Sequence, residues 1–133
     1  MEDFLNVNLD DIPEQIALEN ATEAKIEVLS AVPNEERRYV LLTCKVIQLA
    51  SGENFDNVKN FTTFLNYPRP EDEELKKNNK LRRLKTAHEA LGISGAISDA
   101  EDYQGKTAWV ILSQSEDDVY GTQNDVKRWV KSK

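Results

Sequence analysis

Ten residues of this chain, Lys76 to Lys85, have the sequence KKNNKLRRLK and carry six basic side chains. The chain as a whole is acidic, with 133 residues and a formal net charge of −7. A dense group of Lys and Arg can bind nucleic-acid phosphates even there, because physiological salt screens charges farther away than about 8 Å. A run of charges on a helix can equally be a solvated face that binds nothing.

Acidic neighbours at helical spacing account for two of the six basic side chains. Asp72 lies four residues before Lys76, and Glu73 lies four residues before Lys77. An acid four positions before a base is the favourable order for an ion pair along a helix. We therefore expect these two lysines to be paired within the helix.

The other four basic side chains of the cluster have no acidic residue four positions earlier. At about 100° per residue, Lys80 and Arg83 share one flank of a helix with Lys76. Arg82 and Lys85 point elsewhere. We therefore expect Lys80 and Arg83 to be the phosphate contacts of this cluster.

Aromatic rings beside basic residues would add a second kind of contact, because single-strand-binding proteins stack bases on exposed rings. In an extended chain, Phe61 and Tyr67 lie on one side and Phe64 on the other. Each ring can instead pack in the core, and periodicity leaves open which side faces inward. The candidate nucleic-acid-binding residues are Lys45, Lys59, Phe61, Phe64, Tyr67, Arg69, Lys80, Arg83, Trp109, Lys127 and Trp129.

Groups that could carry catalysis or hold a metal are sparse. His88 is the only histidine, lies beside a stripe of leucines and has no neighbour suited to orient it as a base, which favours a structural role. Cys44 is the only cysteine and lies in an apolar run, where a thiol usually behaves as a small buried hydrophobe. Phosphate-binding Gly-rich loops, nucleophile elbows and zinc-ligand spacings do not occur in the sequence. We expect a non-enzymatic protein without cofactor or metal.

The amino-terminal half of the chain predicts three strands. Apolar residues alternate with charged ones from Ala24 to Val28, and a turn follows at 32–37. Residues 38–49 are apolar on both faces, which is typical of a central strand. After a connection at 50–54, residues 58–67 form the third strand and make a plausible hairpin with the second.

The period then changes to that of a helix. Pro70 stands at an expected first helical position, four acidic residues follow it, and Gly92 is placed to end the helix after Leu91. Beyond a small-residue loop, residues 106–114 predict a fourth strand. A polar turn at 115–123 leads to a short fifth strand at 124–130.

The order strand, strand, strand, helix, strand, strand is that of the OB-fold. In this five-stranded barrel the second and third strands, with nearby loops, bind oligonucleotides or oligosaccharides. We expect a mainly β protein, a β-barrel with one helix, although other α+β folds share the order. Residues 1–15 are acidic and predict a mobile N-terminal arm before a single OB-fold domain at 16–133. The chain contains no apolar run of bilayer-spanning length and its start is acidic, so we expect a cytoplasmic protein without membrane contact.

Two long segments add a resemblance to a known family. They are TTFLNYPRPEDEELKKNNKLRRLKTAHEALGI and YQGKTAWVILSQSEDDVYGTQNDVKRWV. With the helix ending ALGI, the GK before the fourth strand and the closing YGTQNDVKRW, the chain resembles small bacteriophage single-stranded DNA-binding proteins of the OB-fold type. The resemblance places Asn124, Val126, Lys127 and Trp129 near the binding groove. Many such proteins end in an acidic tail that recruits partners, whereas this chain ends KRWVKSK.

The resulting hypothesis is a sequence-tolerant single-stranded DNA-binding protein that acts in phage DNA replication or recombination, in the host cytoplasm. Replication or recombination proteins and further copies of the chain are possible partners. Two alternatives stay open. One is an OB-fold protein-interaction module whose basic helix docks an acidic partner, and the other is a virion structural protein without nucleic-acid binding.

Overall fold

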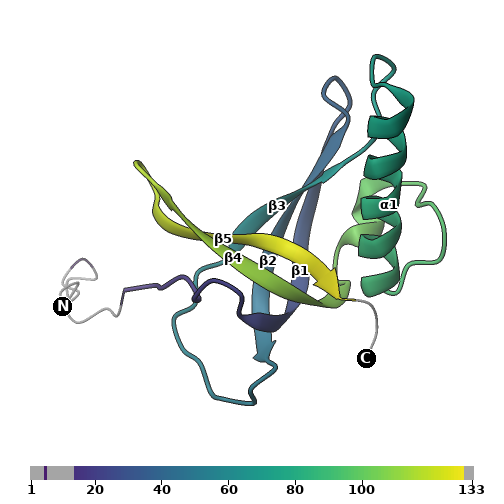
Figure 1. The fold of residues 1–133 in the computed structure, drawn as a ribbon. Coiled ribbons are helices and arrows are strands. Elements are labelled where there is room, and N and C mark those ends of the chain that lie inside the picture. Colours follow the sequence, from purple (N-terminus) through teal and green to yellow (C-terminus); the bar gives the residue numbers. More distant parts are fainter. Residues whose placement is uncertain (1–4, 6–13, 131–133) are drawn as a thin grey trace.

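The structure is a computed structural model that describes Leu5 and residues 14–130 (Figure 1). Almost all of the predicted N-terminal arm at 1–15 lies outside the described residues. The expected order of strands and helix is confirmed. The elements are β1 (Glu23–Asn34), β2 (Tyr39–Leu49), β3 (Phe61–Asn66), α1 (Glu74–Ala90), the short 3-10 helix η1 (Ala100–Tyr103), β4 (Thr107–Asp117) and β5 (Gly121–Val130).

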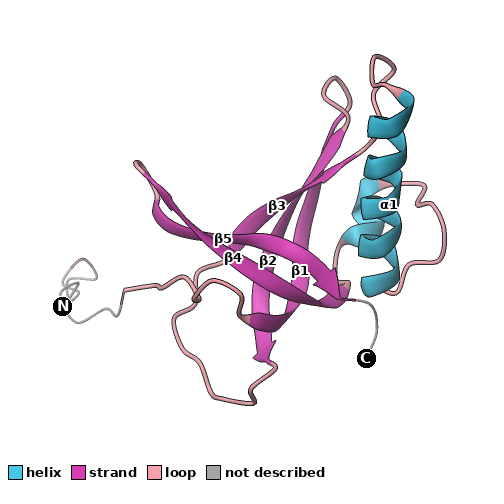
Figure 2. Ribbon diagram, viewed as in Figure 1, coloured by secondary structure: helices cyan, strands magenta, loops and turns pink. Residues whose placement is uncertain are grey.

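All five strands belong to one antiparallel sheet in the order β3-β2-β1-β4-β5 (Figure 2). The long strand β1 pairs with β2 over its whole length and with β4 over its first half. Two register shifts in the β1–β2 ladder bend these strands, as β-bulges do. The sheet curls until β3 and β5 approach each other, but these two strands do not pair. The fold is thus OB-like, with one α-helix among the described residues. The sheet curls like a barrel but does not close.

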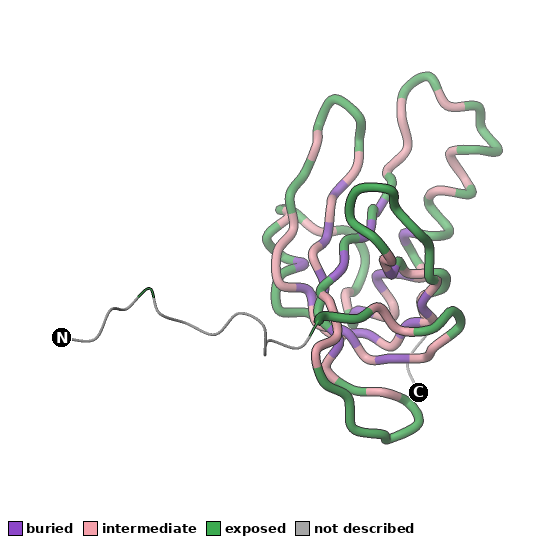
Figure 3. The backbone as a smooth tube through the Cα atoms, turned by 90° about the vertical axis from the view of Figure 1, so that its left-hand side faces the viewer, coloured by how far each residue is buried: buried purple, intermediate pink, exposed green. Residues whose placement is uncertain are grey.

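Alternating side chains of the strands form the core. Ile26 and Val28 of β1, Leu42 of β2 and Leu112 of β4 are almost completely buried, and every second residue between them is more exposed (Figure 3). Cys44 is also buried, as predicted. Burial, and secondarily the charge of Asp125, raises the pKa of its thiol to about 12. The thiol therefore stays protonated and packs as an apolar group.

Helix α1 covers one end of the curled sheet (Figure 2). Leu84 and Ala87 are buried within α1, and Leu91 follows directly after it. The predicted ending is confirmed, because Gly92 has a φ of 75° and its N–H donates to the Glu89 carbonyl. The Ile93 N–H donates to the helix carbonyl five residues earlier, which completes a Schellman motif.

The helix begins later than the sequence predicts. Its first residue is Glu74, and Glu73 is the N-cap, so Pro70 is not the first helical residue. Instead Pro70 lies in a turn in which the Asp72 N–H donates to the Arg69 carbonyl. Proline with an acidic residue two positions later suits such a turn as well as it suits a helix start.

The β4–β5 hairpin is longer than predicted. The segment 115–123 was expected to be a polar turn, yet β4 continues to Asp117 and β5 begins at Gly121. Backbone hydrogen bonds form the ladder there, and they need no apolar side chains. Gly121 has a φ of 74°, the left-handed conformation that a short hairpin loop uses before its returning strand.

A chain of buried and partly buried hydrogen bonds ties α1 to the loop that follows it. His88 Nδ1 lies 2.8 Å from the Gly95 carbonyl, and Nε2 lies 2.6 Å from the Tyr103 hydroxyl. The Tyr103 hydroxyl also pairs with that of Tyr67. Since a carbonyl only accepts, His88 Nδ1 is the donor to Gly95. The His88 ring thereby holds helix, loop and η1 together.

Candidate nucleic-acid interface

A groove of about 720 Å³ lies between β3, α1 and β5, where the sheet is not closed. Each of the three elements contributes a wall made of consecutive or near-consecutive residues. We call it the β3–α1–β5 groove. Its lining consists of Thr63, Phe64, Leu65 and Asn66 from β3, Lys80, Arg82, Arg83, Leu84 and Thr86 from α1, and Val126, Lys127, Arg128 and Trp129 from β5.

The charge of this groove is opposite to that of the chain. Five of its lining residues are basic and none is acidic, although the whole chain has a formal net charge of −7. Arg82 and Arg83 on the helix wall, and Lys127 and Arg128 on the strand wall, are exposed to solvent. A hollow lined by charges of one sign attracts counter-ions locally whatever the sum over the molecule. The groove therefore suits a polyanion.

An irregularity in β5 explains why four successive residues of a strand line one groove. Arg128 pairs with Ile111, and Val126 pairs with Leu112, so Lys127 is an additional residue without an opposite partner. Such a bulge breaks the strict alternation of side chains and redirects one of them. It brings Lys127 to the same groove as its neighbours.

Two aromatic rings lie at the groove. Phe64 of β3 is 52% exposed and meets Tyr39 of β2 edge to face, with ring centroids 4.9 Å apart. Trp129 of β5 packs against the core and remains partly accessible. The two rings come from opposite walls, so a flexible chain in the groove could stack on either of them.

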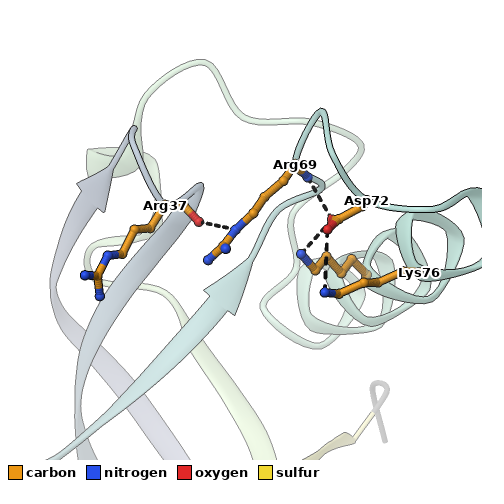
Figure 4. A network of polar contacts seen from close by, with 5 residues as sticks. Arg37, Arg69, Asp72 and Lys76 are labelled. Carbon is orange, nitrogen blue, oxygen red and sulfur yellow. Dashed lines mark hydrogen bonds and ion pairs between the residues drawn. The ribbon is translucent and has the colours of Figure 1, made fainter.

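Lys80 lines the groove but is not a free cation. Its Nζ lies 2.7 Å from Asp72 Oδ2, and Lys76 Nζ lies 3.7 Å from Asp72 Oδ1. The Arg69 N–H also donates to Asp72 Oδ2, at 2.9 Å (Figure 4). The expected pair between Asp72 and Lys76 is confirmed. Lys80 has no acidic residue four positions earlier, and its partner Asp72 lies eight positions earlier, in the turn before α1, where the four-residue spacing rule does not apply.

These contacts stabilise the ionised form of Asp72. The hydrogen bond from Lys80 and the one from the Arg69 N–H lower the pKa of the carboxyl from 3.8 to about 2. Because the folded pKa lies below the unfolded one, the contribution of Asp72 to stability is complete above about pH 4. That contribution is lost as the pH falls through about 2.

Asp72→Asn is therefore expected to flatten the acid limb of the stability curve. Chemical unfolding of both proteins at a series of pH values between about 4 and 2 measures this effect. The free energy of unfolding should fall less steeply with decreasing pH in the variant. Equal slopes for the two proteins would show that Asp72 is not held ionised by Lys80 and Arg69.

Two of the predicted stacking rings lie on the inner side of the sheet. Phe61 is only 3% exposed and belongs to the core, so its expected role in stacking is corrected. Tyr67 follows the same alternation and directs its hydroxyl to Tyr103. The predicted separation of these two rings from Phe64 is correct. The packing of the curled sheet around its core determines that Phe61 faces inward and Phe64 faces outward.

The predicted cations Lys59 and Arg69 hold loops rather than line the groove. Lys59 Nζ donates to the Thr122 carbonyl at 3.0 Å and to the Tyr120 carbonyl at 3.4 Å, in the β4–β5 hairpin. Arg69 Nε donates to the Arg37 carbonyl at 2.9 Å, in the β1–β2 turn (Figure 4). Both contacts join segments far apart in the sequence, which spacing rules do not detect.

The remaining predicted residues divide between the groove and the outer face. Lys45 is exposed on β2, and Trp109 is partly buried on β4, but neither lines the β3–α1–β5 groove. Five of the eleven candidates do line it, and they come from three different elements. These five are Phe64, Lys80, Arg83, Lys127 and Trp129.

Arg82 and Arg128 line the groove and were not among the candidates. At 100° per residue, Arg82 lies away from the narrow helix flank that Lys80 and Arg83 share. A groove as wide as this one accepts side chains from a broader arc. Arg128 adjoins Lys127 and Trp129, so the dense basic and aromatic run KRW was the available signal.

A second hollow, of about 830 Å³, lies between α1 and the loop 92–97. Leu81, Leu84 and Ile93 make much of its wall, and Lys85 and Glu89 contribute one charge of each sign. Lys85 thus faces a different hollow from Arg82 and Arg83. The mixed charge makes this second hollow a poor site for a polyanion.

Other kinds of site find less support in the described part of the chain. No three His, Cys, Asp or Glu side chains gather there as metal ligands. Among the same residues, no helix has the length and apolar character needed to cross a membrane. No protein-family model and no curated protein matches the sequence significantly. The geometry of the groove is therefore the main ground for a functional assignment.

Proposed function

We propose that this protein is a non-enzymatic single-stranded DNA-binding protein that holds the strand in the β3–α1–β5 groove without strict sequence preference. One observation carries the proposal: five basic residues and no carboxylate line this groove in an acidic chain. Arg82, Arg83, Lys127 and Arg128 would contact phosphates, because their side chains are exposed there. Lys80 would contribute less, since Asp72 already compensates its charge.

The two rings favour a single strand over a duplex. Phe64 and Trp129 could stack on unpaired bases, whereas bases in a duplex present no free faces. Stacking tolerates every base, because each has a π-face, and this supports binding without strict sequence preference. The OB-like strand order adds support, since oligonucleotide binding is common in that fold. The resemblance of the two quoted segments supports a role in phage DNA replication or recombination.

Fluorescence anisotropy of a labelled oligothymidine tests the proposal. The protein is titrated into the single strand and into a duplex of equal length, over a series of salt concentrations. With four phosphate contacts, a plot of log affinity against log salt for the single strand should have a slope of about −3. The duplex should bind much more weakly. Absence of binding at low salt would overturn the proposal and favour an acidic protein partner for the groove.

A further inference from the structure

The β4–β5 hairpin extends away from the rest of the sheet and from α1 (Figure 1). Its tip carries Val119, which is 81% exposed, and Tyr120, which is 72% exposed. These are the two most exposed large hydrophobic side chains among the described residues. Such residues side by side at a projecting tip suggest that the tip enters a hollow of another molecule.

Several hydrogen bonds link the residues of the tip to one another and to Lys59. Asp117 Oδ1 accepts from the N–H groups of Val119 and Tyr120, at 2.8 and 2.9 Å. The Tyr120 carbonyl accepts from Gln123 Nε2 at 2.7 Å, and Lys59 Nζ reaches it from the segment before β3. A tip that is already ordered loses little conformational entropy when it binds.

The chemistry of the tip is complementary to that of the β3–α1–β5 groove. Glu116, Asp117 and Asp118 are exposed carboxylates beside the Tyr120 ring, and the groove combines cations with aromatic rings. The two backbone N–H groups lower the pKa of Asp117, because they stabilise its ionised form. Carboxylates next to a ring imitate the phosphates and base of a nucleotide.

We propose that the β4–β5 hairpin tip of one copy of this chain docks into the β3–α1–β5 groove of a second copy. A tip cannot reach the groove of its own chain, because both lie along β5. Tyr120 and Lys127 are seven residues apart, which is roughly 23 Å along a strand. The contact therefore joins two different surfaces and can repeat head to tail.

Docking of this kind would place the hairpin tip and single-stranded DNA in competition for one groove. The inference depends on the charge and lining of the groove and does not require that the groove bind DNA. Attraction between tip and groove combines burial of Val119 and Tyr120 with charge attraction, so both loss of these side chains and added salt should weaken it. The net charge of −7 on each copy also opposes long-range approach, which favours short and reversible assemblies.

Sedimentation velocity over a range of protein concentrations tests the contact. At low salt the wild-type protein should sediment as a reversible mixture of species above the 15.2 kDa of one chain. At about 0.5 M salt it should sediment as a monomer. The double variant Val119→Ser, Tyr120→Ser should stay monomeric at low salt. Leu75→Ser removes an exposed apolar side chain elsewhere and should leave the assembly intact.

A mixing experiment distinguishes the head-to-tail contact from a symmetric one. The double variant Arg82→Glu, Arg83→Glu reverses the charge of the helix wall of the groove and keeps the tip. The tip variant keeps the groove unchanged. Each variant alone should be monomeric, since one of its two surfaces is lost. Their mixture should form a dimer of about 30 kDa, twice the mass of one chain, and nothing larger. No dimer in the mixture would overturn the inference.

Two further outcomes would also overturn it: a wild-type protein that is monomeric at every concentration, or assemblies that persist in the tip variant. The oligothymidine titration tests the proposed function independently of assembly. Assembly without oligothymidine binding would overturn the proposed function and leave the tip–groove contact standing. Oligothymidine binding by a protein that never assembles would support the proposed function and overturn the tip–groove contact. If both hold, oligothymidine should dissolve the assemblies.

Discussion

Phe61→Ala should lower the free energy of unfolding by about 3–5 kcal/mol, whereas Phe64→Ala should change it by less than about 1 kcal/mol. The reason is burial: the Phe61 ring is 3% exposed in the core, and the Phe64 ring is 52% exposed at the groove. Small domains are stable by only about 5–15 kcal/mol, so the first substitution removes a large share of the total. Chemical denaturation of both variants measures the difference.

The order of the two variants should reverse in DNA binding. Phe64→Ala should weaken oligothymidine binding by about 1–3 kcal/mol, which is roughly 5- to 150-fold, because one stacking ring is lost. Phe61→Ala should leave the affinity of the folded fraction near that of the wild type, as this ring has no access to a ligand. If Phe64→Ala binds normally, the ring is not a stacking platform and the proposed path of the strand is wrong.

Arg83→Gln combined with Lys127→Gln should reduce oligothymidine affinity by roughly a hundredfold at about 50 mM salt. Both side chains line the groove, one from α1 and one from β5. Each phosphate contact contributes about 0.7 to the salt dependence of single-strand binding, so the slope should become less steep by about 1.4. The same anisotropy titration, run over a salt series, gives both quantities.

A matched control separates groove contacts from overall charge. Lys45→Gln with Lys85→Gln changes the net charge by the same amount, but neither residue lines the β3–α1–β5 groove. This pair should bind nearly as well as the wild type. Equal losses in the two double variants would show that affinity follows net charge, and the groove would then not be the binding site.

Much of the fold could be predicted from local patterns. The alternation around Ile26 and the apolar run around Cys44 indicated buried strands, and both residues are buried. Gly92 marked the end of the helix, because a left-handed residue is needed there. These signals are reliable because they depend on the conformation of a few adjacent residues.

Predictions that needed distant partners were less accurate. Lys80 is predicted as a phosphate contact, because no acidic residue stands four positions earlier, yet the turn before α1 brings Asp72 to within 2.7 Å of it. Arg82 was assigned away from the binding face, yet it lines the groove. Lys59 is a predicted nucleic-acid-binding residue, yet its Nζ donates to carbonyls of the β4–β5 hairpin. In each case the surroundings of the side chain depend on a segment that is not its helical or strand neighbour. Residue spacing along one element does not predict such contacts.

The sequence by itself determined the order of strands and helix along the chain, the end of the helix, and the separation of Phe61 from Phe64 on opposite sides of β3. Side-chain periodicity is a local property, so the chain alone carries it. Only the tertiary structure decided which side faces inward, because that depends on where the other strands and α1 pack. The approach of β3 and β5 without pairing, with α1 alongside, gathers cations from distant segments into one groove.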